Sequence, residues 1–397
     1  MEKSALVRST HRSSSTHFRG FDGVRAIAIL LVVLWHGANA TRFPIDALGP
    51  LVPVVTMGWS GVDLFFALSG FLITSLLLRE ERRCEAATGQ VHFSLKRFYL
   101  RRALRILPVF YAVFLLNTYL FSGYLPCADG QKVLASGSPL GLWPYATFWG
   151  NYFAAYHPLF GKGAVFPGTA YAVLWSLCVE EHFYLLWPSF LALVKSPRLR
   201  ISVAVAICLA MAIGRFVAQA GQAAHVENIP QLSHVRMDSI LWGAVGAMVV
   251  ERLPSVATPR RLVLLLGATL IGGMVWRGDL TALSKPSPLG ISVGLTLLAL
   301  VSTVLLVELI KAPHSWLVRA LEWSPIAWVG RLSYAMYLVH FQAIDLGRQL
   351  VFTKPRAPTL TSFVLVQGLF VLFSVAGAVV LHLVIERPFL RLKDRFA

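Results

Sequence analysis

The sequence predicts an all-α fold, a polytopic membrane helical bundle of about ten transmembrane helices with both termini inside (N-in and C-in). Composition is the first reason: of 397 residues, 56% are hydrophobic and 14% are charged, and the mean hydropathy is +0.65. A soluble domain of this length is far less apolar. The second reason is that Lys and Arg gather in short segments between long apolar runs, as the positive-inside rule predicts.

Ten apolar segments have about the length that a bilayer requires, although the sixth and seventh are short. With the N-terminus inside, the inside segments carry most of the 36 basic residues, which favours an even number of spans. The predicted spans are 24–40, 59–78, 103–121, 174–194, 201–218, 237–250, 262–276, 289–310, 326–344 and 362–385.

The segment 139–156 is apolar and aromatic but contains Pro144, Gly150 and Asn151. Counting it as a span would reverse everything that follows, so we expect an interfacial or re-entrant piece of a long outer loop, 122–172. The chain then forms one membrane domain, 18–391, between a cytoplasmic N-terminal tail, 1–17, and a cytoplasmic C-terminal tail, 392–397.

Several other classes are disfavoured by the sequence. The net charge of +17 is spread over the short connecting segments, so no nucleic-acid partner is expected. The four cysteines lack the spacing of a metal site or a disulfide framework. The run before Ala38-Asn39-Ala40 also matches a cleaved signal peptide, but a first spanning helix is the simpler interpretation because the remaining chain is itself apolar.

The first span carries one arginine and one histidine, Arg25 and His36. Eleven helical steps are nearly three turns, so both side chains share one face, roughly 16 Å apart. The residues between them are apolar, so we expect both to face a protein interior or a wet cavity. The alternative is an arginine that reaches the lipid surface and a hydrogen-bonded interfacial histidine.

The second span places Asp63 and Ser69 at lipid depth, and Gly61 and Gly70 allow close helix approach. A buried carboxylate requires a partner, and we expect one from the end of the first span.

Before the third span, Arg97, Arg101 and Arg105 form a basic stripe at helical spacing. Such a stripe either binds anionic lipid or recognises a phosphorylated ligand that arrives from the cytoplasm.

The fourth span contains the strongest acid–base constellation, the consecutive residues Glu180, Glu181 and His182. A structural ion-pair network is the alternative. Later spans add further polar groups at membrane depth. For Tyr337 and His340 among them we expect packing in an aromatic belt near the membrane surface. These groups are Arg236, Asp238, Tyr337 and His340.

Together these stretches resemble the integral-membrane acyltransferase family 3, which includes bacterial O-antigen and polysaccharide O-acetylases and macrolide acyltransferases. Two features depart from the family pattern: His182 stands where glutamine is usual, and we expect no C-terminal esterase-like domain. The matching pieces, in family order, are the Arg25/His36 pair, GVDLFFALSGFLIT, FYLRRALRILPVFY, LWSLCVEEHFYLLWP, RMDSILWGA, WVGRLSYAMYLVH and IERPF.

The resemblance implies a multi-pass enzyme of the bacterial inner (cytoplasmic) membrane that moves an acyl group, commonly acetyl, from acyl-coenzyme A to a sugar or glycan hydroxyl. Acyl-coenzyme A is then a co-substrate, with no tightly bound cofactor and no metal. Membrane lipid is the remaining partner. Alternatives are an acceptor such as a macrolide sugar, or a proton-coupled transporter or flippase, which also needs buried charges.

Site roles follow from the resemblance and from the chemistry of the residues. We expect His36 to act as general base, oriented by Glu181 or Asp63, with an acyl-histidine intermediate as the rival route. Ser69 and Tyr337 are candidate oxyanion donors. The basic residues expected to hold coenzyme A phosphates are Arg25, Arg97, Arg101 and Arg105, and the expected substrate contacts are Glu180, His182, Ser69, Arg236, Asp238, Tyr337 and His340.

Overall fold

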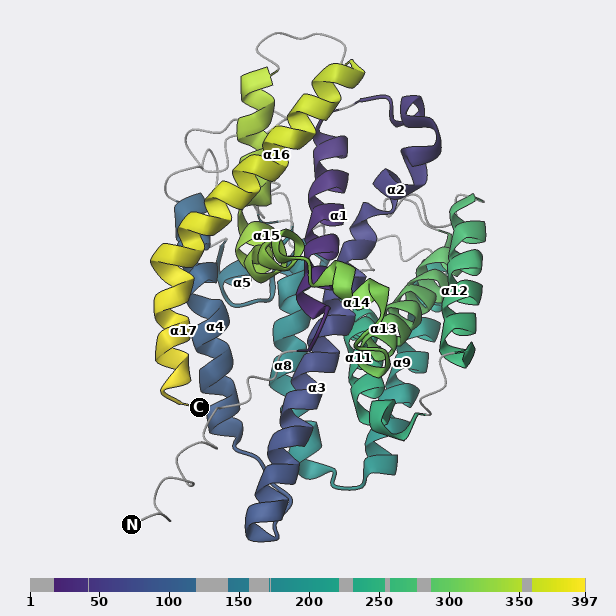
Figure 1. The fold of residues 1–397 in the computed structure, drawn as a ribbon, viewed down its shortest axis with the longest axis vertical. Helices are drawn as coiled ribbons and strands as arrows, with labels where there is room; N and C mark the ends of the chain where they lie inside the picture. Colours follow the sequence, from purple (N-terminus) through teal and green to yellow (C-terminus); the bar gives the residue numbers. More distant parts are fainter. Residues whose placement is uncertain are drawn as a thin grey trace.

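In the computed structural model, all regular secondary structure in the described part of the chain is helical (Figure 1). The predicted tail 1–17 lies outside the described residues, as does most of the predicted outer loop. The structure describes residues 18–41, 43–118, 142–156, 171, 173–220, 231–253, 258–276, 287–351 and 359–396.

Each of the ten predicted segments coincides with a long helix. Several of these helices extend past the predicted ends, because Leu, Arg and Glu in the flanks are good helix formers. The long helices are α1 (Phe21–Thr41), α3 (Gly61–Thr88), α4 (Leu95–Leu116), α8 (Trp175–Leu193), α9 (Pro197–Ala220), α11 (Asp238–Val249), α12 (Thr258–Trp276), α13 (Leu295–Lys311), α15 (Ser324–Val351) and α16 (Leu360–Leu381).

Short helical elements connect them. Among these, α5 and α6 are too short to cross a bilayer and lie within the segment expected at the interface. The short elements are η1 (Ile45–Leu51), α2 (Val52–Thr56), η2 (Gly58–Ser60), α5 (Trp143–Ala146), α6 (Gly150–Tyr156), α10 (Ser233–Arg236), η7 (Val250–Arg252), η8 (Gly290–Gly294), α14 (Trp316–Leu321), η9 (His382–Glu386) and α17 (Arg387–Asp394).

Among the described residues, five helical stretches are long and apolar enough to cross a membrane, so the chain is a multi-pass membrane protein. The count of ten spans and the orientation of the termini stay predictions. The five stretches are Phe21–Thr41, Ile45–Thr88, Pro197–Ala220, Gly290–Lys311 and Leu360–Lys393.

Local sequence explains several helix ends. The Ser94 side chain accepts a hydrogen bond from the Arg97 backbone N–H and caps α4. Thr359 and Ser362 form a reciprocal capping box at the start of α16. At the C-terminal end of α3, Gly89 adopts a left-handed conformation with φ of 72°, which glycine tolerates without strain.

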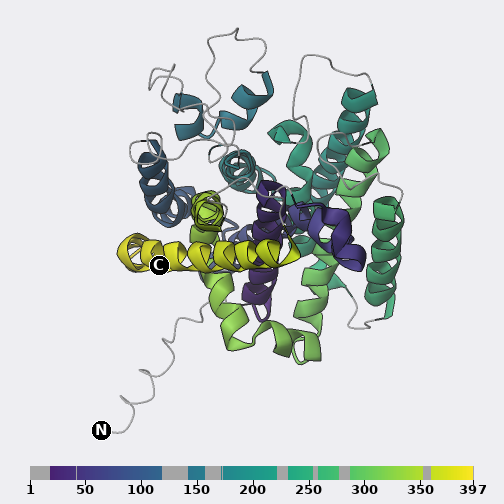
Figure 2. The same cartoon turned by 90° about the horizontal axis from the view of Figure 1, so that it is seen from above.

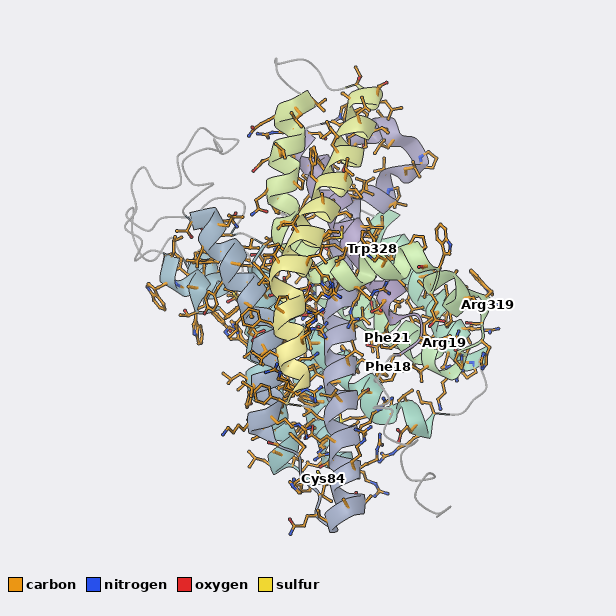
Figure 3. All side chains as sticks on the ribbon, turned by 60° about the vertical axis from the view of Figure 1, so that its left-hand side comes forward. Phe18, Arg19, Phe21, Cys84, Arg319 and Trp328 are labelled. Carbon is orange, nitrogen blue, oxygen red and sulfur yellow. The ribbon has the colours of Figure 1, made fainter. Side chains whose placement is uncertain are left out.

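Helix α1 lies near the middle of the bundle, and α16 extends from beside α1 toward one edge (Figure 2). Helix α3 extends well past the first turn of α1: Phe18 and Phe21 lie partway along α3, whereas Cys84 lies near its far end (Figure 3). This offset leaves the second half of α3 to form the wall of a space below α1.

Small residues bring the helices into direct backbone contact. A Cβ at Gly70 of α3 would collide with the Ile240 carbonyl of α11, and a Cβ at Gly243 of α11 would collide with the Ala67 carbonyl of α3. Gly61 similarly lies against the Ala28 carbonyl of α1. The close approach predicted for Gly61 and Gly70 is therefore confirmed.

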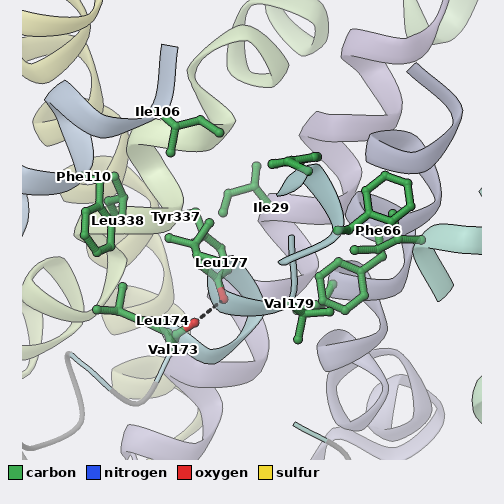
Figure 4. Packing of buried hydrophobic residues seen from close by; sticks show 14 of the residues in the cluster. Ile29, Phe66, Ile106, Phe110, Val173, Leu174, Leu177, Val179, Tyr337 and Leu338 are labelled. Atoms are coloured by element: carbon green, nitrogen blue, oxygen red, sulfur yellow. Dashed lines mark hydrogen bonds between the residues drawn. The ribbon is translucent and has the colours of Figure 1, made fainter. Parts of the chain in front are cut away.

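The main apolar core joins α1, α3, α4, α8 and α15. It includes Ile29, Phe66, Phe110, Leu177 and Leu338, which come together from five separate helices (Figure 4). The core lies beside the polar groups described next and fixes the helices that carry them.

Candidate active site

A cavity of about 330 Å³ lies between α1, α3, α4, α8 and α15. On α3 its lining extends from Val62 to Glu80, a rise of about 27 Å. One end is formed by Arg79 of α3, Arg101 of α4 and Lys393 of α17. The other end reaches the region of Tyr337, so the cavity is deep and elongated rather than a shallow surface depression.

Basic side chains outnumber acidic ones along this cavity. The acidic residues are Asp22, Glu80 and Glu180, and Asp22 accepts a hydrogen bond from Arg25 at 2.7 Å. The basic residues are Arg25, Arg79, Arg101, Arg102, Arg105 and Lys393. Like charges in a partly buried space repel one another, so this lining favours an anionic ligand.

The centre of the cationic group is formed by Arg102 and Arg105. Arg102 lies over the Tyr184 ring at 3.8 Å from its centroid, and its buried Nε has no hydrogen-bond partner. Arg105 is within electrostatic range of Arg25 and Arg102. An unpartnered buried guanidinium N–H is costly, and a bound anion would satisfy it.

The predicted arginine stripe is only partly assembled. Arg101 and Arg105 line the cavity, as does Arg25. Arg97 is not among the lining residues, and its Nε donates instead to the Phe396 carbonyl at 2.8 Å. Arg97 therefore holds the end of the chain against α4.

Two hydroxyl groups at the far end of the cavity already have acceptors. Ser69 Oγ donates to Glu180 Oε1 at 2.6 Å. Tyr337 donates to the Val173 carbonyl at 2.8 Å, the bond dashed in Figure 4, and Ser176 Oγ lies 2.6 Å from the same phenol oxygen. Both protons are therefore directed at acceptors within the protein in this arrangement, and the role of the two hydroxyls as oxyanion donors stays a prediction.

His36 lies beyond this end of the cavity and is not among its lining residues. Its Nδ1 is 3.0 Å from the Val32 carbonyl and 3.2 Å from Nε2 of His340. His340 is fully buried, and its Nδ1 lies 2.6 Å from the carbonyl of Tyr337. The expected aromatic-belt position of Tyr337 and His340 is wrong, because both are core residues.

The carboxylate expected beside His36 is absent from its partners. Asp63 is completely buried and accepts from Arg236 at 2.9 Å and from Ser239 at 3.1 Å. Glu181 is within electrostatic range of Arg102 and Glu180. Asp63 thus joins α3 to α11, and the group that contacts His36 is another histidine.

Arg236 and Asp238 do not form one substrate-binding pair. Arg236 is the partner of Asp63, whereas Asp238 accepts two bonds from Arg215, each 2.7 Å long. Both side chains of the Arg215–Asp238 pair are 0% exposed. These contacts join α9, α11 and α3.

The consecutive acid–base residues point in different directions. Glu180 faces the cavity, whereas His182 contacts Ser233 of α10 through Nδ1 at 2.7 Å and does not line the cavity. The Trp149 ring lies 4.9 Å from the His182 ring, and the buried Nε2 of His182 has no partner. Only Glu180 of this group is part of the cavity.

A family profile described as an acyltransferase domain matches residues 18–383. The chain belongs to acyltransferase family 3. This match covers the whole bundle up to η9 and includes every helix that lines the cavity except α17. No solved structure matches the chain.

Three bacterial relatives of this family 3 member are similar at low identity. Peptidoglycan O-acetyltransferase OatA of Listeria monocytogenes is 27% identical over 350 residues, 86% of this chain and 51% of the relative. The putative peptidoglycan O-acetyltransferase YrhL of Bacillus subtilis is 27% identical, over 83% and 49%. O-acetyltransferase OatA of Staphylococcus aureus is 26% identical, over 87% and 53%. The chain spans about half the length of these curated relatives.

Sequence reasoning missed some residues of this family 3 site. Arg102 directly follows Arg101 in α4, and both line the cavity. Arg79 also lines it, 4.5 Å over the Phe18 ring. Arg215, which lies outside the cavity, had a visible signal, because it stands within an apolar run. In the described ranges, no three His, Cys, Asp or Glu side chains gather as a metal site.

Proposed function

We propose that this family 3 protein is a membrane O-acyltransferase that moves an acyl group, acetyl in the first instance, from acyl-coenzyme A to a hydroxyl of a glycan. The observation that supports the proposal best is the excess of arginine along a deep cavity whose far end is connected to a histidine through His340 and Tyr337. Family membership and the printed names of the relatives support acyl transfer to a glycan.

The proposed donor fits the charge and shape of the cavity. Coenzyme A carries several phosphates at one end and a thioester at the end of a long flexible arm. Arg79, Arg101 and Arg105 offer planar guanidinium groups suited to phosphate oxygens. The arm would then extend along α3 toward Tyr337, over a distance of about 27 Å from Glu80 to Val62.

In the proposed chemical step, His36 Nε2 takes the proton of the acceptor hydroxyl as its oxygen attacks the thioester carbonyl. The C–S bond breaks, the sulfur leaves as coenzyme A thiolate, and the proton on His36 passes to that sulfur. This uses His36 as base and then acid, so no proton is lost or gained overall. In the rival route, acylation of His36 itself comes first, and a burst of free thiol without acceptor would reveal it.

The acceptor is proposed from the relatives alone. Two of them carry names that specify peptidoglycan, so a glycan of the bacterial envelope is the first acceptor to test. A glycosylated lipophilic product is the second acceptor class.

The test is a coupled assay with the purified full chain in lipid vesicles. Acetyl-coenzyme A and a peptidoglycan fragment are supplied, and free thiol and the mass of the fragment are measured. The proposal expects thiol release that depends on the fragment, with one acetyl ester gained for each thiol. Movement of the fragment across the vesicle without thiol release would favour a transporter and contradict the proposal.

A further inference from the structure

We propose that His340 is the positioning residue of His36: it fixes the proton of the His36 ring on Nδ1 and thereby leaves Nε2 as the basic atom. The inference rests on the proposed function, in which His36 is the base. It assigns to a neutral imidazole the task that a carboxylate performs in a serine-protease triad.

The tautomer of His340 follows from one contact. Its Nδ1 lies 2.6 Å from the backbone carbonyl of Tyr337, and a carbonyl can only accept. Nδ1 of His340 must therefore carry a proton. Because the side chain is 0% exposed, the neutral ring is the less costly form, and its Nε2 then presents a lone pair.

The tautomer of His36 follows from the next contact. Its Nδ1 faces two acceptors, the Val32 carbonyl at 3.0 Å and the His340 Nε2 lone pair at 3.2 Å. Only an N–H at Nδ1 suits both of them. A neutral His36 ring carries a single N–H, so a protonated Nδ1 leaves Nε2 unprotonated, and among the described residues Nε2 has no hydrogen-bond partner.

The surroundings keep the two rings in place. Their centroids are 5.0 Å apart, and Phe341 packs against both, at 4.7 Å from His36 and 4.8 Å from His340. The helices that carry them, α1 and α15, are in close backbone contact, where Gly330 lies against Asp22. A rigid pair of helices thus fixes both the distance and the angle.

This arrangement also serves the charged form. When His36 Nε2 takes a proton, its Nδ1–H still points at the lone pair of His340, which stabilises the imidazolium. A buried neutral partner avoids the desolvation cost of a buried carboxylate. Loss of this partner lets the His36 ring rotate or adopt the other tautomer, which places the proton on the atom that must accept one.

The direct test is the tautomeric state of the two rings. The full chain is labelled with 15N-histidine in lipid nanodiscs, and imidazole nitrogen shifts are assigned with His36→Gln and His340→Gln. We expect protonated Nδ1 and unprotonated Nε2 at both positions, and a mixture of tautomers at His36 once His340 is leucine, which cannot accept the Nδ1–H. A protonated Nε2 at His36 in the unmodified protein would overturn the proposal.

Kinetics supply the second readout. His340→Leu should lower kcat about 10- to 100-fold, part of the 10²–10⁴ that a general base contributes, with the KM of donor and acceptor unchanged. His340→Gln, whose side-chain oxygen can still accept from His36, should keep more activity than the leucine variant. The exposed His314→Gln is the matched control and should behave as the unmodified chain.

The outcomes separate this inference from the proposed function. Full activity of His36→Ala removes His36 as the base and with it the role of His340, whereas acyl transfer itself stands; an unmodified chain that transfers no acetyl group contradicts the proposed function. An inactive His36→Ala beside a His340→Leu variant of normal kcat leaves the proposed function standing and removes only the role of His340. A His340→Leu variant whose loss lies in KM, or in membrane abundance with no gain for glutamine, also contradicts positioning.

Discussion

Ionisable groups are paired on one side of the bundle and largely unmatched on the other. Around α9 and α11, Arg215 is matched by Asp238 and Arg236 by Asp63, all nearly or completely buried. Around α1, α4 and α8, Arg102 and Arg105 instead line a cavity in which cations are in excess. Both sides carry arginine, yet on the cavity side only Arg25, through Asp22, has a carboxylate hydrogen-bond partner among the described contacts.

This difference between the paired side and the cavity side indicates that arginine has two roles in this bundle. A buried charge that has a geometric partner holds helices in register, and its loss leaves the partner uncompensated. A charge without a partner is kept only where water or a ligand can reach it. Substitutions on the paired side should therefore reduce stability, whereas substitutions on the cavity side should reduce activity at constant stability.

The largest effect is expected on the cavity side, at His36. His36→Ala should lower kcat about 10²- to 10⁴-fold, because a general base supplies an acceleration of that size. Membrane abundance should stay as in the unmodified protein. Acetyl transfer to a glycan fragment measures kcat, and quantitative immunoblotting of membranes measures abundance. An equal fall in both would contradict the claim that substitutions on the cavity side reduce activity at constant stability.

On the paired side, Arg215→Met should destabilise the fold by about 3–5 kcal/mol, because it leaves Asp238 buried and uncompensated. Thermal unfolding in detergent measures the loss. The double variant Arg215→Met, Asp238→Leu should recover part of it, since the orphaned carboxylate is then gone. A double variant no more stable than the single one would show that the pair is not the cause.

The packing beside these pairs gives a smaller effect. Gly70→Ala would push a methyl group into the Ile240 carbonyl of α11, so the fold should lose about 1–3 kcal/mol. At Gly368 of α16 a Cβ would meet nothing within 4 Å, so Gly368→Ala is the matched control. Unfolding temperatures of the two variants should differ, and equal values would contradict the contact between α3 and α11.

The smallest effect sharpens the cavity side itself. Arg105→Gln should raise the KM for acetyl-coenzyme A about tenfold, or 1.4 kcal/mol, with the acceptor KM unchanged. Arg97→Gln, eight residues earlier in the predicted stripe but outside the cavity, should leave both constants unchanged. Initial rates at varied donor concentration measure the donor KM of both variants. An equal change in the two variants would favour lipid binding as the role of these arginines.

The sequence predicted the helices well because apolar runs of bilayer length have few alternatives. It also predicted that Arg25 would face an interior space, since no apolar neighbour could accept its charge. The hydrogen-bond and ion-pair partners of the polar residues were harder to predict, because a nearly all-apolar helix does not reveal which face it buries. Hence Asp63 was assigned to His36 when it binds Arg236, and the histidine that does contact His36 was expected at the membrane surface.

The last helix has a practical consequence for work on this protein. Lys393 belongs to the wall of the cavity, and Arg97 holds the Phe396 carbonyl against α4. A purification tag or fluorescent reporter joined after residue 397 would therefore be attached close to this wall of the cavity. Kinetic constants from such fusions should be compared with those of the same protein after removal of the tag, before any change in donor affinity is attributed to a point substitution.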